Sequence, residues 1–299
     1  MGPIGIFDSG IGGLTVARAA CDLLPSESVL YFGDTAHLPY GEKSPELIRK
    51  YSTRIALHLV NSGCKAIVVA CNSASSNALE QVREAVGDSI PVIDMVHPVV
   101  ESLYVSGGSS NSGAVSSSGD AAFSVALSTT GEPSRSKKVG LIGTRATISS
   151  ELYKSAIESL NNGSKETVKL ISRATPLLAS AIEEGFYNDT IPGAVLEAYL
   201  EDGFFNELDS IILGCTHYPL VSEEVKALLP KSVEVINSPK IVALALKKAL
   251  SERGLLVDES AQSVVSNKFQ VSDLTENFRL GAERFFGGNI SLDEVDLTL

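Results

Sequence analysis

Short apolar runs alternate with longer amphipathic segments along the N-terminal third of the chain. The runs PIGIF, SVLYF, AIVVA and PVIDM, which begin at residues 3, 28, 66 and 91, have the length and composition of buried strands. The segments between them, such as 44–61 and 74–86, have the length and apolar spacing of helices. This alternation predicts parallel strands joined by crossover helices.

The same alternation starts again at KVGLIG. Strands are expected at KVGLIG, VKLIS, SIILG and VEVIN, and helices from about Thr147, through 176–203, after Pro219 and over 239–253. The repetition predicts an α/β fold class with two units. After the last of these helices come a strand-like SNKFQVSD and a helix-like TENFRLGAERFFG, whose apolar residues share one face, so we expect this tail to pack on one unit.

A polar segment separates the two units. Residues 106–136 hold 11 Ser and 5 Gly in 31 positions. This composition cannot bury enough apolar surface to fold by itself, and it predicts a disordered Ser/Gly-rich insertion. Because flexible loops tolerate changes of length, we expect the rest of the protein to work without most of this segment.

Composition narrows the class of protein. The chain has 299 residues, of which 44% are hydrophobic, enough for a large core and for two domains. Its net charge of −12 opposes binding to nucleic acid, because that binding depends on Lys and Arg side chains that neutralise phosphates. No apolar stretch approaches the roughly 20 residues needed to span a bilayer, and MGPIGIFDSG lacks the features of a signal peptide. We therefore expect a cytoplasmic protein without a membrane partner.

Two of the apolar runs end in a cysteine that is followed by polar residues. AIVVACNSASS contains Cys71, and SIILGCTHYPL contains Cys215. In a parallel α/β sheet, ligands bind beyond the carboxyl ends of the strands, where free helix N–H groups favour a thiolate or a substrate carboxylate. Asn72, Ser73 and Thr216 add hydrogen-bonding groups at the same edge. The alternative is that both cysteines are only small buried residues in tight strand-to-helix turns.

Two other strand ends carry groups suited to chemistry. FDSGIGGL places Asp8 and Ser9 before a glycine-rich turn, and FGDTAHLPYG places Asp34, Tyr40 and Gly41 in a loop. The glycines do not form a phosphate-binding loop, because the G-x-G-x-x-G pattern lacks its third glycine, no G-K-[ST] follows, and the Asp8 carboxylate would repel a phosphate. A nucleotide is therefore not expected.

The sequence offers few metal ligands. His217 stands two residues after Cys215, a pair that supplies fewer ligands than a zinc site needs. The other histidines show no regular ligand spacing, and the two remaining cysteines lie in segments where an inert core position is expected. We expect neither a metal nor an organic cofactor.

Two thiols at separate strand ends, without a redox or cofactor motif, suit stereoinversion by two bases. One thiolate removes a proton from one face of a carbon atom, and a thiol delivers a proton to the other face. A free cysteine has a pKa of about 8.5 and is only a few per cent thiolate at neutral pH, so neighbouring groups must set unequal protonation states. Asp8 near one thiol and His217 near the other would serve that purpose.

At these residues the chain resembles the glutamate racemases of the cofactor-independent aspartate/glutamate racemase superfamily. The resemblance spans nearly all of the chain outside the Ser/Gly-rich insertion, and its most specific elements are DSGIGGL and GCTHYPL. The other matching stretches are YFGDTAHLPYG, VVACNSAS, LIGTRATISS, PLLASAIEEG and the terminal FQVSDLTENFRLGAERFFGGNISLDEVDL. The resemblance implies an isomerase that interconverts L- and D-glutamate and supplies D-glutamate for peptidoglycan precursor synthesis.

The resemblance also implies a fold and a division of roles. Two α/β domains with mainly parallel sheets would face each other across the active site, the first formed by 1–97 plus 239–299 and the second by 98–238. Cys71 would be the base for D-glutamate, and Cys215 the base for L-glutamate. The partners that manage protons would be Asp8, Glu183 and His217, and the substrate contacts would be Ser9, Tyr40, Gly41, Asn72, Ser73, Thr144, Thr147 and Thr216.

Several alternatives stay open at the level of sequence. The substrate could be aspartate, because pocket size is not visible in a sequence, and a non-catalytic α/β protein that binds a small acidic metabolite would keep the same loops. Either Glu183 or Glu184 could face the site, and His97 stands where the family commonly has an acidic residue. The resemblance is compatible with a homodimer and does not fix the oligomeric state.

Overall fold

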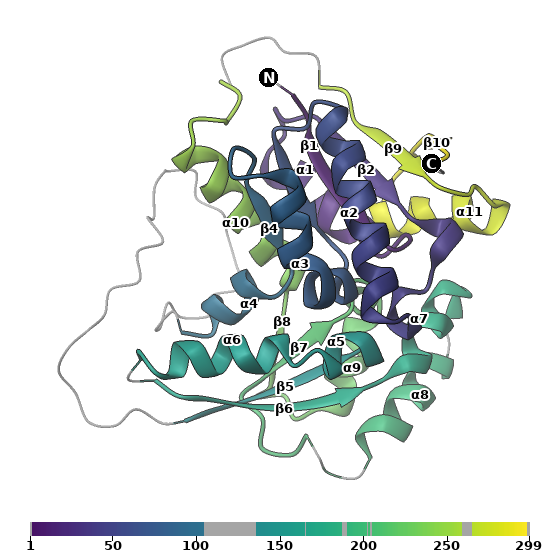
Figure 1. Cartoon of the computed structure of the whole chain (residues 1–299). Helices are drawn as coiled ribbons and strands as arrows, with labels where there is room; N and C mark the ends of the chain where they lie inside the picture. Colours follow the sequence, from purple (N-terminus) through teal and green to yellow (C-terminus); the bar gives the residue numbers. More distant parts are fainter. Residues whose placement is uncertain are drawn as a thin grey trace.

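The computed structural model describes residues 2–104, 136–164, 166–186, 190–201, 203, 205–258 and 265–297, with the backbone only at 277. The predicted Ser/Gly-rich insertion, 106–136, therefore lies outside the described residues except for its last position. Within the described part of the chain, two parallel sheets form two α/β units, as the repeated sequence pattern predicts (Figure 1).

The first sheet is built around the N-terminal strands. Among the described residues it has six parallel strands, in the order β10 (Leu292–Glu294), β9 (Lys268–Val271), β2 (Val29–Gly33), β1 (Ile4–Asp8), β3 (Ala66–Val69) and β4 (Val92–Asp94). Every residue of β1, β2 and β3 is buried, as expected for a parallel sheet covered by helices on both faces. Because β1 and β3 are inner strands of this order, the loops that follow them leave the carboxyl edge of the sheet away from its two ends.

The second sheet is drawn in teal and green in the lower half of Figure 1. In the described residues it has four parallel strands, in the order β6 (Val168–Ala174), β5 (Lys137–Gly143), β7 (Ser210–Gly214) and β8 (Glu234–Ile236). A cysteine follows an inner strand in both sheets, β3 in the first and β7 in the second.

Helices cover the two faces of the first sheet according to the alternating direction of its side chains. Ile4 and Ile6 of β1 pack on the side of α1 (Leu14–Leu23) and α10 (Ser238–Glu252), whereas Phe7 packs on the side of α2 (Pro45–Asn61) and α3 (Asn72–Val86). The other α-helices are α4 (His97–Ser102), α5 (Arg145–Ser149), α6 (Leu152–Asn161), α7 (Pro176–Glu183), α8 (Thr190–Leu200), α9 (Ser222–Leu228) and α11 (Glu276–Phe286).

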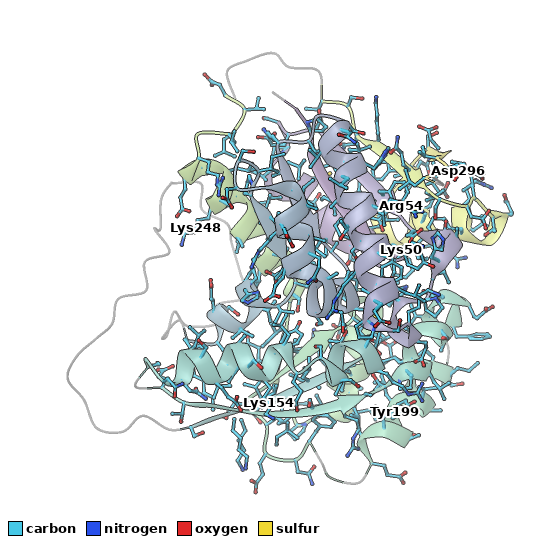
Figure 2. The ribbon with its side chains drawn as sticks, viewed as in Figure 1. Lys50, Arg54, Lys154, Tyr199, Lys248 and Asp296 are labelled. Carbon is cyan, nitrogen blue, oxygen red and sulfur yellow. The ribbon has the colours of Figure 1, made fainter. Side chains whose placement is uncertain are left out.

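Charged side chains lie on the outer surfaces of these helices. Lys50 on α2, Lys154 on α6 and Lys248 on α10, all labelled in Figure 2, are exposed. The helices are thus amphipathic, with an apolar face toward a sheet and a polar face toward solvent. Searched over the described residues, the chain has no helix that is both long and apolar enough to cross a membrane.

One apolar cluster continues from the first sheet into the second. It includes Ile6 and Val68 of the first sheet, Leu141 and Ile212 of the second, and Val96 in the connection between them. Helix α4 contacts both α6 and α10, and α3 contacts α5. The two units are therefore packed against each other, while the domain boundaries expected after residues 97 and 238 stay a prediction.

The C-terminal segment returns to the first unit, where it appears in yellow in Figure 1. Strand β9 pairs with β2, and α11 packs against α1 with its predicted apolar face buried. Lys65 holds the segment between α10 and β9, because its Nζ donates a hydrogen bond to Leu255 O at 2.7 Å. The same Nζ lies 2.5 Å from Glu27 Oε2. Both charged side chains are buried, so removing either one would leave an uncompensated charge in the interior.

Candidate active site

The two cysteines that follow inner strands line the same cavity. Cys71 comes two residues after β3 and caps the N-terminus of α3, where its Sγ accepts a hydrogen bond from the Ala74 N–H at 3.4 Å. Cys215 directly follows β7 and precedes a short 3-10 turn, η4 (Tyr218–Val221). Both side chains are buried, and both line a cavity of about 210 Å³ whose walls come from both units. Thiols from two different sheets therefore meet at one site.

The cavity brings together most of the residues predicted for the site. Asp8 and Thr147 are buried beside it without lining it. The Asp8 carboxylate accepts from the Thr216 hydroxyl at 3.4 Å, and the Thr147 hydroxyl accepts from Thr144 at 3.0 Å, so both contact the cavity through residues that line it. The predicted residues that do line it are Ser9, Tyr40, Gly41, Cys71, Asn72, Ser73, Thr144, Glu183, Cys215, Thr216 and His217.

Cys71 lies in an environment that opposes its ionisation. Burial and the nearby Asp8 carboxylate raise the pKa of the Cys71 thiol to about 12. The Ala74 N–H and the Ser9 hydroxyl, which lies 3.6 Å from Sγ, offset only part of this shift. Cys71 is therefore held as a neutral thiol at neutral pH.

Cys215 has a cationic neighbour instead. His217 Nδ1 is 3.5 Å from Cys215 Sγ, and His217 Nε2 is 2.9 Å from Glu183 Oε1. Burial alone would lower the pKa of His217, but the Glu183 carboxylate and Cys215 raise it well above its ordinary value. The ring also makes an edge-to-face contact with Phe285 of α11 at a centroid distance of 5.3 Å. A protonated His217 places a positive charge 3.5 Å from Cys215 Sγ.

Hydroxyl groups from both units form one wall of the cavity. Ser73 Oγ lies 2.9 Å from Thr144 Oγ1, which joins α3 of the first unit to the start of α5 in the second. The Tyr40 hydroxyl donates to Asp34 Oδ2 at 2.5 Å, and burial together with Asp34 raises the pKa of Tyr40 well above its ordinary value. Neutral hydroxyls and the free N–H groups at the start of α3 suit a small carboxylate ligand.

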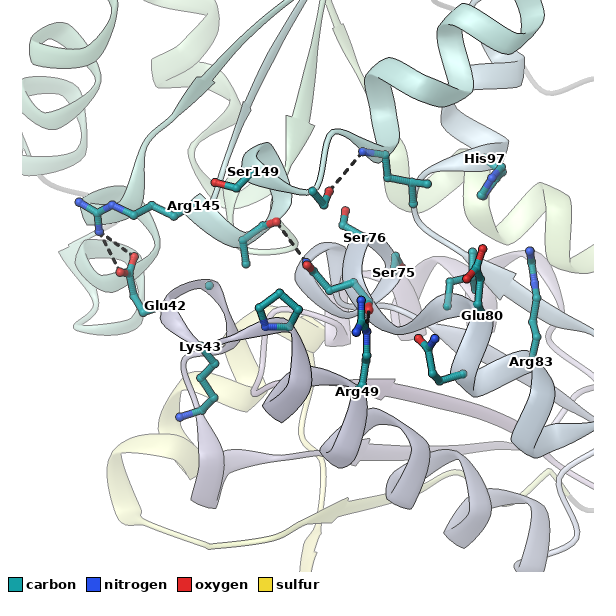
Figure 3. Close-up of a pocket in the computed structure, with 18 residues that line it drawn as sticks. Glu42, Lys43, Arg49, Ser75, Ser76, Glu80, Arg83, His97, Arg145 and Ser149 are labelled. Carbon is teal, nitrogen blue, oxygen red and sulfur yellow. Dashed lines mark hydrogen bonds and ion pairs between the residues drawn. The ribbon is translucent and has the colours of Figure 1, made fainter.

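The structure distinguishes Glu183 from Glu184. Glu183 lines the cavity and pairs with His217, whereas Glu184 is exposed at the end of α7. His97 lies outside the cavity, where its Nδ1 is 3.0 Å from both carboxylate oxygens of Asp94. It lines a larger groove, shown in Figure 3.

Known proteins resemble this chain over nearly its whole length. Residues 112–246 match the family model described as Asp/Glu/Hydantoin racemase. The chain is 37% identical to the glutamate racemase of Chlorobaculum tepidum over 295 residues, which cover 99% of this chain and 95% of that protein. The chain belongs to the glutamate racemases.

Solved glutamate racemases have the same fold. The enzyme from Francisella tularensis, in complex with D-glutamate, matches with a TM-score of 0.81 and 32% identity, covering 99% of this chain and 98% of that one. The isoform RacE1 from Bacillus anthracis matches with a TM-score of 0.82, the same identity and the same coverage. The protein is therefore an amino-acid racemase with the two-unit α/β fold of its family.

Part of the lining of this glutamate racemase site was missed from the sequence. Arg145 directly follows Thr144, and Ser180 lies one helical turn before Glu183 on α7, so neighbourhood and spacing could have indicated both. Arg145 Nη1 is 2.9 Å from both carboxylate oxygens of Glu42. Glu42 and Arg145 line both this cavity and the larger groove, of about 640 Å³, so their ion pair borders both. The pair is drawn at the groove in Figure 3. The other missed lining residues are Pro39, Glu42, Pro176, Leu177 and Ala179.

Proposed function

We propose that the enzyme interconverts L- and D-glutamate with Cys71 and Cys215 as bases on opposite faces of the substrate. The observation that carries this proposal is that the two thiols line one cavity and have opposite electrostatic neighbours. Cys71 is close to a carboxylate, and Cys215 is close to a histidine with a raised pKa. A two-base inversion requires one thiolate and one thiol at the same time.

The resting protonation states prepare the site for L-glutamate. The Cys215 thiolate removes the Cα proton of L-glutamate and becomes a thiol, and the electron pair stays on the substrate as a carbanion. The Cys71 thiol then protonates the opposite face, which yields D-glutamate and leaves Cys71 as a thiolate. With D-glutamate the two cysteines exchange roles. Proton exchange with solvent restores the resting state after each turnover.

The groups behind each cysteine set these states. Glu183 keeps His217 protonated, and the His217 charge stabilises the Cys215 thiolate at a sulfur-to-nitrogen distance of 3.5 Å. Burial and Asp8 destabilise the anion of Cys71, so that Cys71 keeps its proton until the substrate carbanion, a much stronger base than a thiolate, takes it. Glu183 therefore acts on Cys215 through His217, and Asp8 acts on Cys71.

Substrate carboxylates would be bound by neutral donors of the wall. Asn72, Ser73, Thr144 and Thr216 line the cavity, and Thr147 supports Thr144. Ser9, Tyr40 and Gly41 complete the wall on the side of the first unit. Glutamate is the substrate named for the relatives, and one of the matched structures holds D-glutamate.

The wider role follows from this reaction. We propose that D-glutamate made here feeds peptidoglycan precursor synthesis. A cytoplasmic location and a homodimer both stay predictions.

The direct test is a polarimetric or circular dichroism assay of the pure protein with D-glutamate and no added pyridoxal phosphate or metal. We expect the optical signal to decay to zero as the racemic mixture forms, and L-glutamate to reach the same end point. Faster conversion of D-aspartate than of D-glutamate would favour the aspartate alternative. Binding of glutamate without any turnover would indicate a binding protein, and activity that is lost on chelation and restored by one metal would refute the thiol mechanism.

Replacing Glu183 with glutamine is expected to change the pH dependence of L-glutamate turnover. The carboxylate raises the pKa of His217, so its loss lowers that pKa and leaves the ring neutral at a pH where the native ring is charged. Between pH 6 and 8, kcat/KM for L-glutamate should therefore fall in the variant, reaching a deficit of roughly 100-fold, while the native profile stays flat.

Glu184→Gln is the matched control, because Glu184 is adjacent in sequence and exposed. It should keep the native profile. An unchanged profile in Glu183→Gln would mean that the charge of His217 does not depend on Glu183.

A further inference from the structure

Asn72 has one end of its amide group held and the other end free. Its Oδ1 accepts a hydrogen bond from the Tyr153 hydroxyl at 2.8 Å. Its Nδ2 is buried and has no hydrogen-bond partner among the described residues. The residue lines the cavity and is only 2% exposed. A buried donor without a partner costs roughly 1–3 kcal/mol unless a ligand fills it.

Tyr153 reaches Asn72 from the other unit. It belongs to α6, is 1% exposed, and is not part of the cavity lining. Burial, with smaller effects from Asp94 and Cys215, raises its pKa, so the phenol keeps its proton. The other acceptor near this hydroxyl, Met95 O, is farther away, at 3.4 Å. The single hydroxyl hydrogen is therefore used in the short bond to Asn72 Oδ1.

We propose that Tyr153 is a positioning residue for substrate binding, which fixes the Asn72 amide so that Nδ2 donates to a substrate carboxylate. The two ends of an amide differ in function, since the oxygen only accepts and the nitrogen only donates. Turning the amide over would present an oxygen to the anionic substrate and would place the amide nitrogen against the phenol. The Tyr153 hydroxyl favours the productive orientation because it already donates its hydrogen to Oδ1.

The inference rests on the proposed function, in which Asn72 contacts the substrate. Its first test is the steady-state kinetics of Tyr153→Phe with both enantiomers of glutamate. We expect KM to rise roughly 10-fold for both, because the Asn72 donor is no longer held toward the carboxylate. The value of kcat should change much less, since the two cysteines and their neighbours are untouched.

Tyr104→Phe is the matched control. The Tyr104 hydroxyl also bonds to α6, at Ile157 O and Asn161 Oδ1, without contacting Asn72 or the cavity. Losing it removes the contact of a similar phenol hydroxyl with α6, and KM should stay at the native value. A rise in KM in this variant equal to that in Tyr153→Phe would assign the effect to α6 packing and overturn the proposal.

A double-mutant cycle separates positioning from general damage. Asn72→Ala should raise KM, and adding Tyr153→Phe to it should raise KM by less than about twofold more, because the positioned group is already gone. An undiminished effect of Tyr153→Phe in that background would overturn the proposal. If the native enzyme racemises glutamate and Asn72→Ala binds it normally, the proposed Asn72 contact is wrong and the positioning role falls with it.

Asn72→Asp supplies a measurement that does not depend on how well Tyr153→Phe folds. The carboxylate keeps an acceptor for the Tyr153 hydroxyl and has the same shape, but it has no donor for the substrate. We expect KM raised at least as much as in Tyr153→Phe, measured on protein that thermal unfolding shows to be folded. Native KM in Asn72→Asp would show that no donor is needed at this position and would overturn the proposal, whereas native racemisation would remain evidence for the proposed function.

Discussion

Replacing Cys71 with alanine is expected to abolish proton removal from D-glutamate, and replacing Cys215 with alanine to abolish it from L-glutamate. The reason is that each thiol lines the cavity from a different sheet, and in the proposed mechanism each serves one face of Cα. The proposed mechanism needs both thiols for racemisation, so turnover should fall roughly 10²- to 10⁴-fold in either variant.

Exchange in deuterated water distinguishes the two variants. A surviving base can return a deuteron to the face that it deprotonated, which labels the substrate without inverting it. We therefore expect Cys71→Ala to label only L-glutamate, through Cys215, and Cys215→Ala to label only D-glutamate, through Cys71. Cα labelling is read by mass spectrometry or by loss of the Cα proton signal in NMR.

Cys64→Ala is the control for this pair. Cys64 is also buried, burial raises its pKa to about 12, and it does not line the cavity. Its variant should racemise normally. Normal racemisation by Cys71→Ala or Cys215→Ala would exclude the two-thiol mechanism, and each variant's fold and glutamate binding should be measured alongside.

Gly12→Ala is expected to lower kcat by roughly 100-fold in both directions without unfolding the protein. A Cβ at this position would lie 2.4 Å from Thr216 Oγ1 and 2.6 Å from His217 Nδ1, both of which are buried. Such contacts are too short to exist, so His217 must move away from Cys215. Glycine is needed here for the close approach of His217.

Gly10→Ala tests this explanation in the same loop. Among the described residues, a Cβ there would meet only Leu38 Cδ2, at 3.7 Å, which is an ordinary contact. We expect this variant to keep native kcat, measured in the same circular dichroism assay. Native kcat in Gly12→Ala would mean that the loop shifts as a whole and that the close approach is not required.

The α/β organisation could be predicted because apolar runs mark buried parallel strands directly. All strands of the second sheet lie where KVGLIG, VKLIS, SIILG and VEVIN place them. Strand β10 was missed, because its three residues are mostly exposed and pair with β9 only in the folded chain. The helix expected from about Thr147 is divided into α5 and α6 at Glu151, which has a φ of 55° that no apolar spacing reveals.

Some residues of the site could likewise be found from the nearby sequence, whereas others are identified only by contacts in the folded chain. The two cysteines could be found because each directly follows an apolar run, and His217 because it is two residues from Cys215. The choice between Glu183 and Glu184 depends on the rotation of α7 against His217, which needs coordinates. Tyr153 gave no signal at all, since a buried tyrosine on a helix is ordinary until its hydroxyl is seen to reach Asn72.

The strand order also determines when the molecule can be completed on the ribosome. Strand β9 pairs with β2, so the first sheet reaches full width only after the last-made strands emerge, although β1 and β2 emerge first. The second sheet, whose strands lie between Lys137 and Ile236, can form earlier. Phe285, which contacts the ring of His217, also belongs to the final segment. A nascent chain therefore carries both thiols well before Phe285 can pack on His217. For that interval β2 presents an open edge to other chains.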